Sequence, residues 1–422
     1  MPARSAAKWN QSDLIRRVLN AIDFGRQTIR TLVENDSLSA GESAPARPEL
    51  LREKLISETA LLLLCVVPIR DLDKRIPEQL DDLAKLLVPW ARHPDVRAAI
   101  CLDPGLARDH AFAHVLLSRI GYRDSDVDDL LANSLKMGAD FGPERLPHRR
   151  LEQQWLADMW GIGVPNKRHN RKLIADSMLG RTMDALGSSR FDIYAFTHAV
   201  MYASDLGQRE IRLSRNRDDI AADAEAALGY SLDTNDFDLT AELLMTWPML
   251  RLQWSSAATF AFTIITGLED RVGFLPGLKC DLADYQSLDR DKRAQFAIAT
   301  SYHTSLVMGC LCSVALREGC TPPATVPCIR HSRRAGAAML RLAATEGSSS
   351  SCWSAPFAAL SSAQQDSLAS LVLAIALRRA RTEGNLRSVH EALELALTHD
   401  LIDGPAPLQA AALLRRTQAL KV

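Results

Sequence analysis

The spacing of apolar residues is the feature that most restricts the fold of this 422-residue chain. In segment after segment, leucine, isoleucine, valine and alanine recur three and four residues apart, as on one face of an α-helix. Proline, glycine and acidic residues mark the breaks, where one helix ends or the next begins. No segment alternates apolar and polar residues between hairpin turns, as a β-strand would. The pattern predicts an all-α protein, arranged as an α/α toroid or an irregular helical-repeat array.

One predicted helix, residues 191–206, carries a polar stripe. On a helix that turns by about 100° per residue, five side chains lie within about 40° of a common line: Tyr194, His198, Tyr202, Asp205 and Arg209. We expect His198 to act as a general base or metal ligand, with Asp205 as its electrostatic partner and Tyr202 as a hydrogen-bond donor. Tyr194 and Arg209 would contact the substrate. The competing interpretation is a buried polar network that only joins neighbouring helices.

Two further predicted helices carry residues that would complete such a site. His303 lies in a predicted helix over residues 290–317, and its neighbour Tyr302 belongs to a second, small and polar face. Glu242 lies in a predicted helix over residues 236–247, which Pro248 should kink or end. We expect His303 to take part in catalysis, and Tyr302 and Glu242 to bind the substrate. The apolar face around His303 equally fits a core histidine.

The same residue types can hold a metal ion. Two histidines and one or two carboxylates bind iron, manganese or zinc, which gives a candidate set for a divalent metal: His198, Asp205, Glu242 and His303. The run Asp233–Asp238 is acidic, as calcium loops are, but Phe237 occupies a ligand position and no glycine marks the turn. Helix capping explains that run better. The sequence contains no phosphate-binding glycine-rich loop and no dinucleotide fingerprint.

Changes in composition divide the chain into three expected parts. Residues 1–47 would form an N-terminal helix and a linker, and residues 48–346 the main helical domain. Residues 347–422 would begin with the Ser-rich linker Gly347–Ser351 and continue as C-terminal helices, either separate or packed on the main domain. Small residues in the segment around His303, among them Gly309, favour close contact between helices.

Charge and apolar content restrict the partners. The formal net charge is −1, so no basic field attracts nucleic acid or an anionic membrane. The most apolar run, residues 60–67, is far shorter than the roughly 20 residues of a membrane span. Neither a cysteine framework nor a secretory signal is visible, so we expect a reducing cytoplasm. The expected partner is a small molecule or a peptide, while the oligomeric state does not follow from the sequence.

Two short motifs resemble a helical family of unknown function. Thr197–Gly207 and Tyr302–Thr304 carry the resemblance, which covers about residues 140–325. That family is associated with actinobacterial gene neighbourhoods, some of them devoted to natural products. The resemblance implies a cytoplasmic helical protein of specialised metabolism, and it assigns no catalytic role to any residue.

Two classes of function therefore compete. The leading hypothesis is a biosynthetic or tailoring enzyme with a His/Asp/Tyr pocket inside a helical scaffold. The alternative is a helical-repeat scaffold that binds a protein or peptide without catalysis. An activity like that of a terpenoid cyclase would rest on architecture alone, and the chain has only 6% aromatic residues and no Asp-rich cluster. An enzyme needs the polar side chains to converge on a cavity, whereas a scaffold would hide them in helix contacts.

Overall fold

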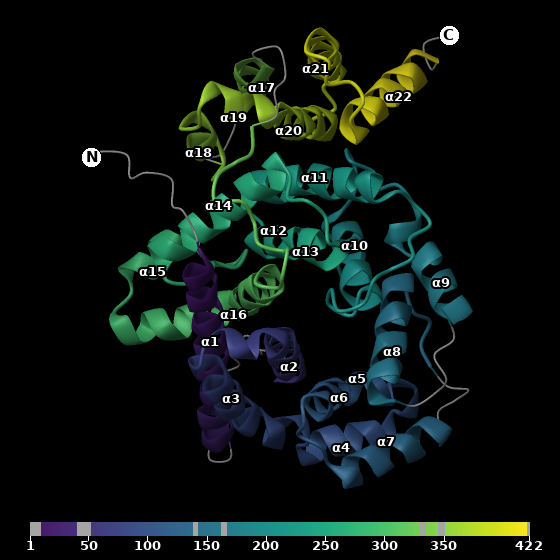
Figure 1. The fold of residues 1–422 in the computed structure, drawn as a ribbon, viewed down its shortest axis with the longest axis vertical. Coiled ribbons are helices and arrows are strands. Elements are labelled where there is room, and N and C mark those ends of the chain that lie inside the picture. Colours follow the sequence, from purple (N-terminus) through teal and green to yellow (C-terminus); the bar gives the residue numbers. More distant parts are fainter. Residues whose placement is uncertain are drawn as a thin grey trace. The chain divides into compact units, whose positions relative to one another are not determined.

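The computed structural model describes residues 10–39, 52–137, 142–161, 167–328, 335–344 and 351–419, and most of these residues are helical. Within these ranges Figure 1 shows helices and no strand. The prediction of an all-α fold is therefore confirmed. The domain boundaries predicted at residues 47 and 346 lie outside the described residues.

The helices form two compact units, each built from segments that are distant in the sequence. Unit 1 comprises Ile174–Gly273 and the described residues from Thr321 onward, and unit 2 comprises Asn10–Leu173 and Phe274–Cys320. The helices of unit 1 are α10 (Arg190–Ala203), α11 (Arg217–Asp233), α12 (Phe237–Leu244), α13 (Thr246–Leu250), α14 (Ser256–Val272), α17 (Ala335–Ala344), α18 (Ser354–Ala358), α19 (Ser362–Ser367), α20 (Ala369–Thr382), α21 (Leu386–Thr398) and α22 (Pro405–Ala419). The helices of unit 2 are α1 (Gln11–Ser39), α2 (Arg52–Val66), α3 (Arg75–Ala91), α4 (Pro94–Leu102), α5 (Ala107–His110), α6 (Phe112–Arg119), α7 (Ser125–Met137), α8 (Pro147–Trp160), α15 (Leu282–Ser287) and α16 (Arg290–Ala315). Helix α9 (Lys167–Asp176) crosses the division, and short 3-10 helices occur at Val67–Leu72, Pro104–Leu106 and Met178–Gly180.

Unit 2 is organised around α16, which packs against α1 and α2. The close helix contact expected around Gly309 is present, since a Cβ atom at this position would lie 2.3 Å from the Cβ of Ala21 on α1. Among the described helices, Lys292–Ala315 is the one long and apolar enough to cross a membrane, and 78% of its most apolar stretch is buried in the structure. A core helix has the same properties, so this helix is only a weak indication of a membrane span.

A buried histidine in unit 2 has its protonation set by two neighbours. His114 on α6 is fully buried, and its Nδ1 accepts a hydrogen bond from Nε of Arg92 at 3.3 Å. Its Nε2 lies 3.0 Å from Oδ1 of Asp128, so a single proton on Nε2 satisfies both contacts. Burial is the main cause that lowers the pKa of His114, against the opposing effect of Asp128. The imidazole is therefore neutral in the folded protein at neutral pH.

Unit 1 is organised around α12, all of whose residues are buried and which packs against α10, α11, α13 and α14. The ring of Trp254 stacks on Trp247 with centroids 6.3 Å apart and meets Phe262 edge-on. The chain leaves the helix after α13, where Arg251 adopts a left-handed φ of 52°. At its other end α13 is separated from α12, which ends at Leu244, so Pro248 lies in a short helix of its own. The interruption predicted around Pro248 is confirmed.

The C-terminal helices of unit 1 hold the turn between α11 and α12. Asp233, the last residue of α11, accepts hydrogen bonds from Nε of Arg379 at 2.8 Å and from Nε1 of Trp353 at 3.2 Å. The backbone N–H of Cys352 donates to Oδ1 of Asn235 at 3.1 Å. Since the side chain of Asn235 accepts a main-chain donor, the turn is tied to residues more than a hundred positions away in the sequence.

Candidate functional site on α10 and α12

Helix α10 carries aromatic and charged side chains at four-residue intervals. A capping box at Ser189 starts the helix at Arg190, which places Arg190 in the same row as the predicted stripe. The rings of Tyr194 and His198 meet edge-to-face with centroids 5.6 Å apart, and those of His198 and Tyr202 at 5.8 Å. The guanidinium of Arg190 lies over the ring of Tyr194 at 4.6 Å. Three residues of the predicted stripe thus lie side by side, as expected.

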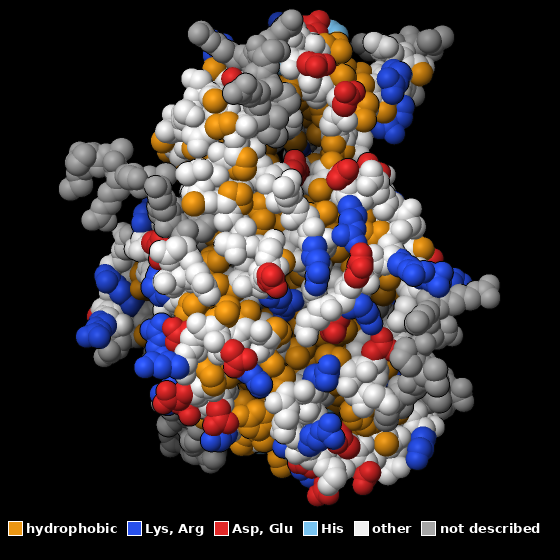
Figure 2. Space-filling view, viewed as in Figure 1, with side chains coloured by type: hydrophobic (Ala, Val, Ile, Leu, Met, Phe, Trp, Pro, Cys, Tyr) orange, Lys and Arg blue, Asp and Glu red, His pale blue; other side chains and the backbone are white. Residues whose placement is uncertain are grey.

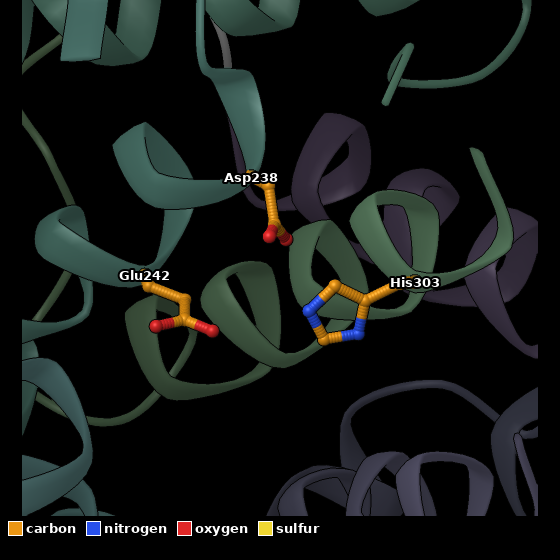
Figure 3. Close-up of side chains that lie close together, drawn as sticks. All are labelled: Asp238, Glu242 and His303. Carbon is orange, nitrogen blue, oxygen red and sulfur yellow. The ribbon is translucent and has the colours of Figure 1, made fainter. Parts of the chain in front are cut away.

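Helix α12 brings carboxylates to the site from a tight turn. Asn235 has a left-handed φ of 54°, and Asp236 then caps α12 by accepting the N–H of Leu239 on Oδ1 at 3.1 Å. This confirms that helix capping explains the acidic run better than a calcium loop. Asp238 and Glu242 follow one helical turn apart (Figure 3). Carboxylates in the first turn of a helix are also stabilised by its dipole.

The guanidinium of Arg190 joins the two helices at their N-terminal ends. Its Nε donates to Oδ2 of Asp236 at 2.6 Å, and its Nη2 lies 3.3 Å from Oδ2 of Asp238. The hydroxyl of Tyr194 donates a short hydrogen bond to the same oxygen of Asp238. Asp236 is 2% exposed and Asp238 is 4% exposed, so these charges are almost removed from water.

One turn further along, Glu242 faces two residues of α10. Its Oε2 accepts a hydrogen bond from Oγ1 of Thr197 at 2.6 Å, and its Oε1 lies 3.8 Å from Nε2 of His198. Glu242 is 3% exposed, whereas the side chain of His198 keeps 20% of its surface exposed. The cluster defined by Arg190, Tyr194, Thr197, His198, Asp236, Asp238 and Glu242 is called the α10–α12 site below.

The environment keeps Tyr194 protonated and Arg190 charged. Burial raises the pKa of Tyr194 far above its ordinary value, and the negative charges of Glu242 and Asp238 add to this effect. Burial alone would lower the pKa of Arg190, but the hydrogen bond to Asp236 and the nearby negative charges outweigh it, so the pKa is raised. The site therefore holds a phenol that acts only as a hydrogen-bond donor or neutral acceptor, next to a permanent cation.

Asp205 and Arg209 do not continue the row, because α10 ends at Ala203. A hydrogen bond from the N–H of Leu206 to the carbonyl of Met201 at 2.8 Å closes the helix, and Asp205 takes a left-handed φ of 51°. Such an ending usually has glycine in this position. The exposed Arg209 donates back to the carbonyl of Ala203 at 3.2 Å. The prediction of a helix to residue 206 is wrong, and the two residues lose the alignment on which their expected roles rested.

His303 and Tyr302 lie on α16 in unit 2. There Nδ1 of His303 is 2.9 Å from Oε1 of Glu58 on α2, and both side chains are partly exposed. The ring of Tyr302 meets that of His303 at 6.4 Å. Because these residues belong to the other unit, their predicted part in catalysis, substrate binding or metal binding stays a prediction.

The comparison with protein families covers most of the chain. Residues 26–313 match the family described as a domain of unknown function (DUF6895). The chain belongs to this family. The matched region starts at residue 26, well before the stretch of about residues 140–325 that the two short motifs indicated. It includes all of α10 and α12. No curated protein and no solved structure matches the chain. The family description names no activity, so the function has to be argued from the site.

Sequence reasoning missed three charged members of the site in this DUF6895 protein. Arg190 lies four residues before Tyr194, but the helix was expected to start one residue later. Asp236 and Asp238 were recognised as acidic and as capping residues, yet their pairing with Arg190 spans 46 and 48 positions. The four-residue spacing from Arg190 to Tyr194 was the available signal, since it places both on one face of a helix.

Proposed function

We propose that this protein is an enzyme that acts on a small molecule by acid–base chemistry at the α10–α12 site. The arrangement of His198 and Glu242 carries the proposal, since Nε2 lies 3.8 Å from Oε1 while Thr197 holds the other carboxylate oxygen. A neutral imidazole accepts a proton near neutral pH, and a neighbouring carboxylate stabilises the imidazolium that forms. The distance exceeds that of a hydrogen bond, as is common in catalytic pairs before a ligand binds.

The neighbouring groups suit a polar substrate. Tyr194 supplies a phenol that stays protonated, and Arg190 supplies a fixed positive charge beside it. In this proposal Glu242 replaces Asp205 as the partner of His198, and Tyr202 packs against the imidazole instead of reaching the substrate. A base, a hydrogen-bond donor and a cation within two helical turns form the minimal set for proton transfer on a polar small molecule.

We also propose the wider setting that the motif resemblance implies. This is a biosynthetic or tailoring role in specialised metabolism, in the cytoplasm, with a small molecule or peptide as the substrate. A net charge of −1 supports a partner other than nucleic acid or a membrane surface. On the face visible in Figure 2, positive and negative side chains are interspersed without a continuous field of one sign. An α/α toroid or helical-repeat arrangement would fit such an enzyme.

A ligand screen with matched variants tests the proposal. Wild type, Glu242→Gln and Glu391→Gln would be screened by thermal shift against polar metabolites. Glu391 is the matched control, because it lies on α21 in the same unit with its side chain 49% exposed. We expect ligands that raise the melting temperature of wild type and Glu391→Gln but not of Glu242→Gln. Ligands that stabilise all three proteins alike, or a library without any selective ligand, would favour the non-catalytic scaffold.

A further inference from the structure

We infer that the α10–α12 site binds one divalent cation of the Mn²⁺ type through the carboxylates of Asp238 and Glu242. This inference deepens the proposed function and rests on it. It differs from the metal set expected from the sequence, because Asp238 enters and His198, Asp205 and His303 leave.

The donor types and their separation fit one ion. Carboxylate oxygens bind divalent ions such as magnesium and manganese. Asp238 and Glu242 are four residues apart and project from the same face of α12 (Figure 3). Two ligand atoms that are each about 2.1 Å from a metal lie at most about 4.2 Å apart. The ligand oxygens of Asp238 and Glu242 lie within 4.8 Å of each other, so a small movement of the side chains brings both to one ion.

Hydrogen bonds from α10 hold both carboxylates in place. Thr197 donates to Oε2 of Glu242 at 2.6 Å, and Tyr194 donates to Oδ2 of Asp238. Carboxylates that bind metals are themselves hydrogen-bonded in this way, which fixes their orientation. A carboxylate has about four acceptor positions, so a hydrogen bond at one oxygen and a metal at the other are compatible. Thr197 and Tyr194 thus orient the two carboxylates without themselves reaching the ion.

A buried hydroxyl gives an independent indication of a ligand. Thr246 is 0% exposed, and its Oγ1 has no hydrogen-bond partner within the described part of the chain. It follows Glu242 by four residues, and a hydrogen bond from the N–H of Met245 to the carbonyl of Ala241 at 3.3 Å carries the helical turn across the junction. Thr246 therefore extends the row that Asp238 and Glu242 begin. Buried polar groups without a partner are rare, and a bound ion or its water would supply one here.

The charges brought together by the two helices favour a cation. The carboxylates of Asp236 and Asp238 face the guanidinium of Arg190, and the carboxylate of Glu242 faces the imidazole of His198. All three carboxylates are at least 95% buried. Carboxylates that are shielded from water attract a positive ligand more strongly than exposed ones do, because charges are screened less away from water. A divalent ion has this charge and the coordination that the donors offer.

Titration of the metal-free protein with Mn²⁺, followed by the electron paramagnetic resonance signal of the free ion, tests the inference. We expect one Mn²⁺ per chain in wild type and in the Glu391→Gln control. Asp238→Asn and Glu242→Gln should each weaken binding at least about 100-fold, since each removes a charged ligand. Thr197→Val leaves the ligands in place and should weaken binding about 10–100-fold by releasing Glu242. Circular dichroism shows whether each variant keeps its helices.

Two results would overturn the inference. One is the absence of stoichiometric Mn²⁺ binding by the folded wild-type protein, and the other is equal binding by wild type, Asp238→Asn and Glu242→Gln. Repeating the ligand screen with EDTA separates the two proposals. Selective ligands that still stabilise the protein in EDTA, without Mn²⁺ binding, would leave acid–base catalysis standing and remove the metal. Mn²⁺ binding without any selective ligand would support the metal site and remove the proposal of acid–base catalysis.

Discussion

Asp236 connects the two helices of the site, and its replacement should weaken unit 1 in two separable ways. Its side chain is 3% exposed. Oδ1 caps α12 through the N–H of Leu239, and Oδ2 accepts from Arg190 at 2.6 Å. Asp236→Ala removes both interactions. Asp236→Asn keeps the cap, because asparagine caps helices about as well as aspartate, and it removes only the charge that pairs with Arg190.

The two contributions can be sized separately. Loss of an N-cap costs about 1 kcal/mol. Breaking a fully buried ion pair costs about 3–5 kcal/mol, but Arg190 keeps 35% of its side chain exposed and also contacts Asp238. Solvent screening then reduces the loss to about 1–2 kcal/mol. We predict that Asp236→Ala lowers the free energy of unfolding by about 2–3 kcal/mol and Asp236→Asn by about 1–2 kcal/mol.

Urea denaturation monitored by circular dichroism measures these changes, provided that the slope with urea stays constant. Arg190→Met completes a double-mutant cycle, in which we expect a coupling of about 1–2 kcal/mol between Asp236 and Arg190. Equal losses in Asp236→Ala and Asp236→Asn would refute the capping contribution. A coupling below about 0.5 kcal/mol would refute the contribution of the ion pair.

Three further predictions concern other parts of the structure. Arg379→Met should cost about 2 kcal/mol, because it removes the hydrogen bonds that Arg379 donates to the mostly buried Asp233, and hydrogen exchange in the turn 234–236 should quicken. Because burial lowers the pKa of His114, this imidazole binds a proton below about pH 6.5 in the unfolded chain but not yet in the folded chain. The free energy of unfolding should therefore fall with falling pH in that range, by at most about 1.4 kcal/mol per pH unit, and His114→Asn should lose this dependence in urea titrations. Tyr194→Phe should cost about 1 kcal/mol and leave the tyrosinate absorbance of the folded protein at alkaline pH unchanged, since Tyr194 does not ionise there.

The helical fold and the core of the site follow from local periodicity. Residues four apart on a helix share a face whatever the rest of the chain does, so Tyr194, His198 and Tyr202 lie in a row as predicted. The same rule places Asp238 and Glu242 on one face of α12. The interruption near Pro248 follows from the backbone N–H that proline lacks. These features need no knowledge of tertiary structure.

The end of α10 was mispredicted because its signal is weak. Glycine is the usual residue in the left-handed position that closes a helix, but here aspartate takes it, at a φ of 51°. Gly207, which the sequence offers as a natural stop, comes two residues later. The sequence pattern therefore places Asp205 in the helical stripe, whereas Asp205 lies just past the end of α10.

The pairing of the two helices could not be read from the sequence. Arg190 meets Asp236 and Asp238 because the turn after α11 sets the register of α12 against α10. That turn depends in part on Arg379, Trp353 and Cys352, which are more than a hundred residues away. Such contacts are decided by packing across the unit and leave no local periodicity.

The free energy of unfolding of His198→Phe tests most directly whether the α10–α12 site serves ligand chemistry or only joins helices. Phenylalanine keeps a ring between Tyr194 and Tyr202 and removes the nitrogen that faces Glu242. We predict a free energy of unfolding within about 0.5 kcal/mol of wild type or higher, because polar groups held for function can be replaced by apolar ones without loss of stability. Binding of selective ligands should be lost. A loss of about 2 kcal/mol or more, with ligand binding intact, would show that the cluster is structural.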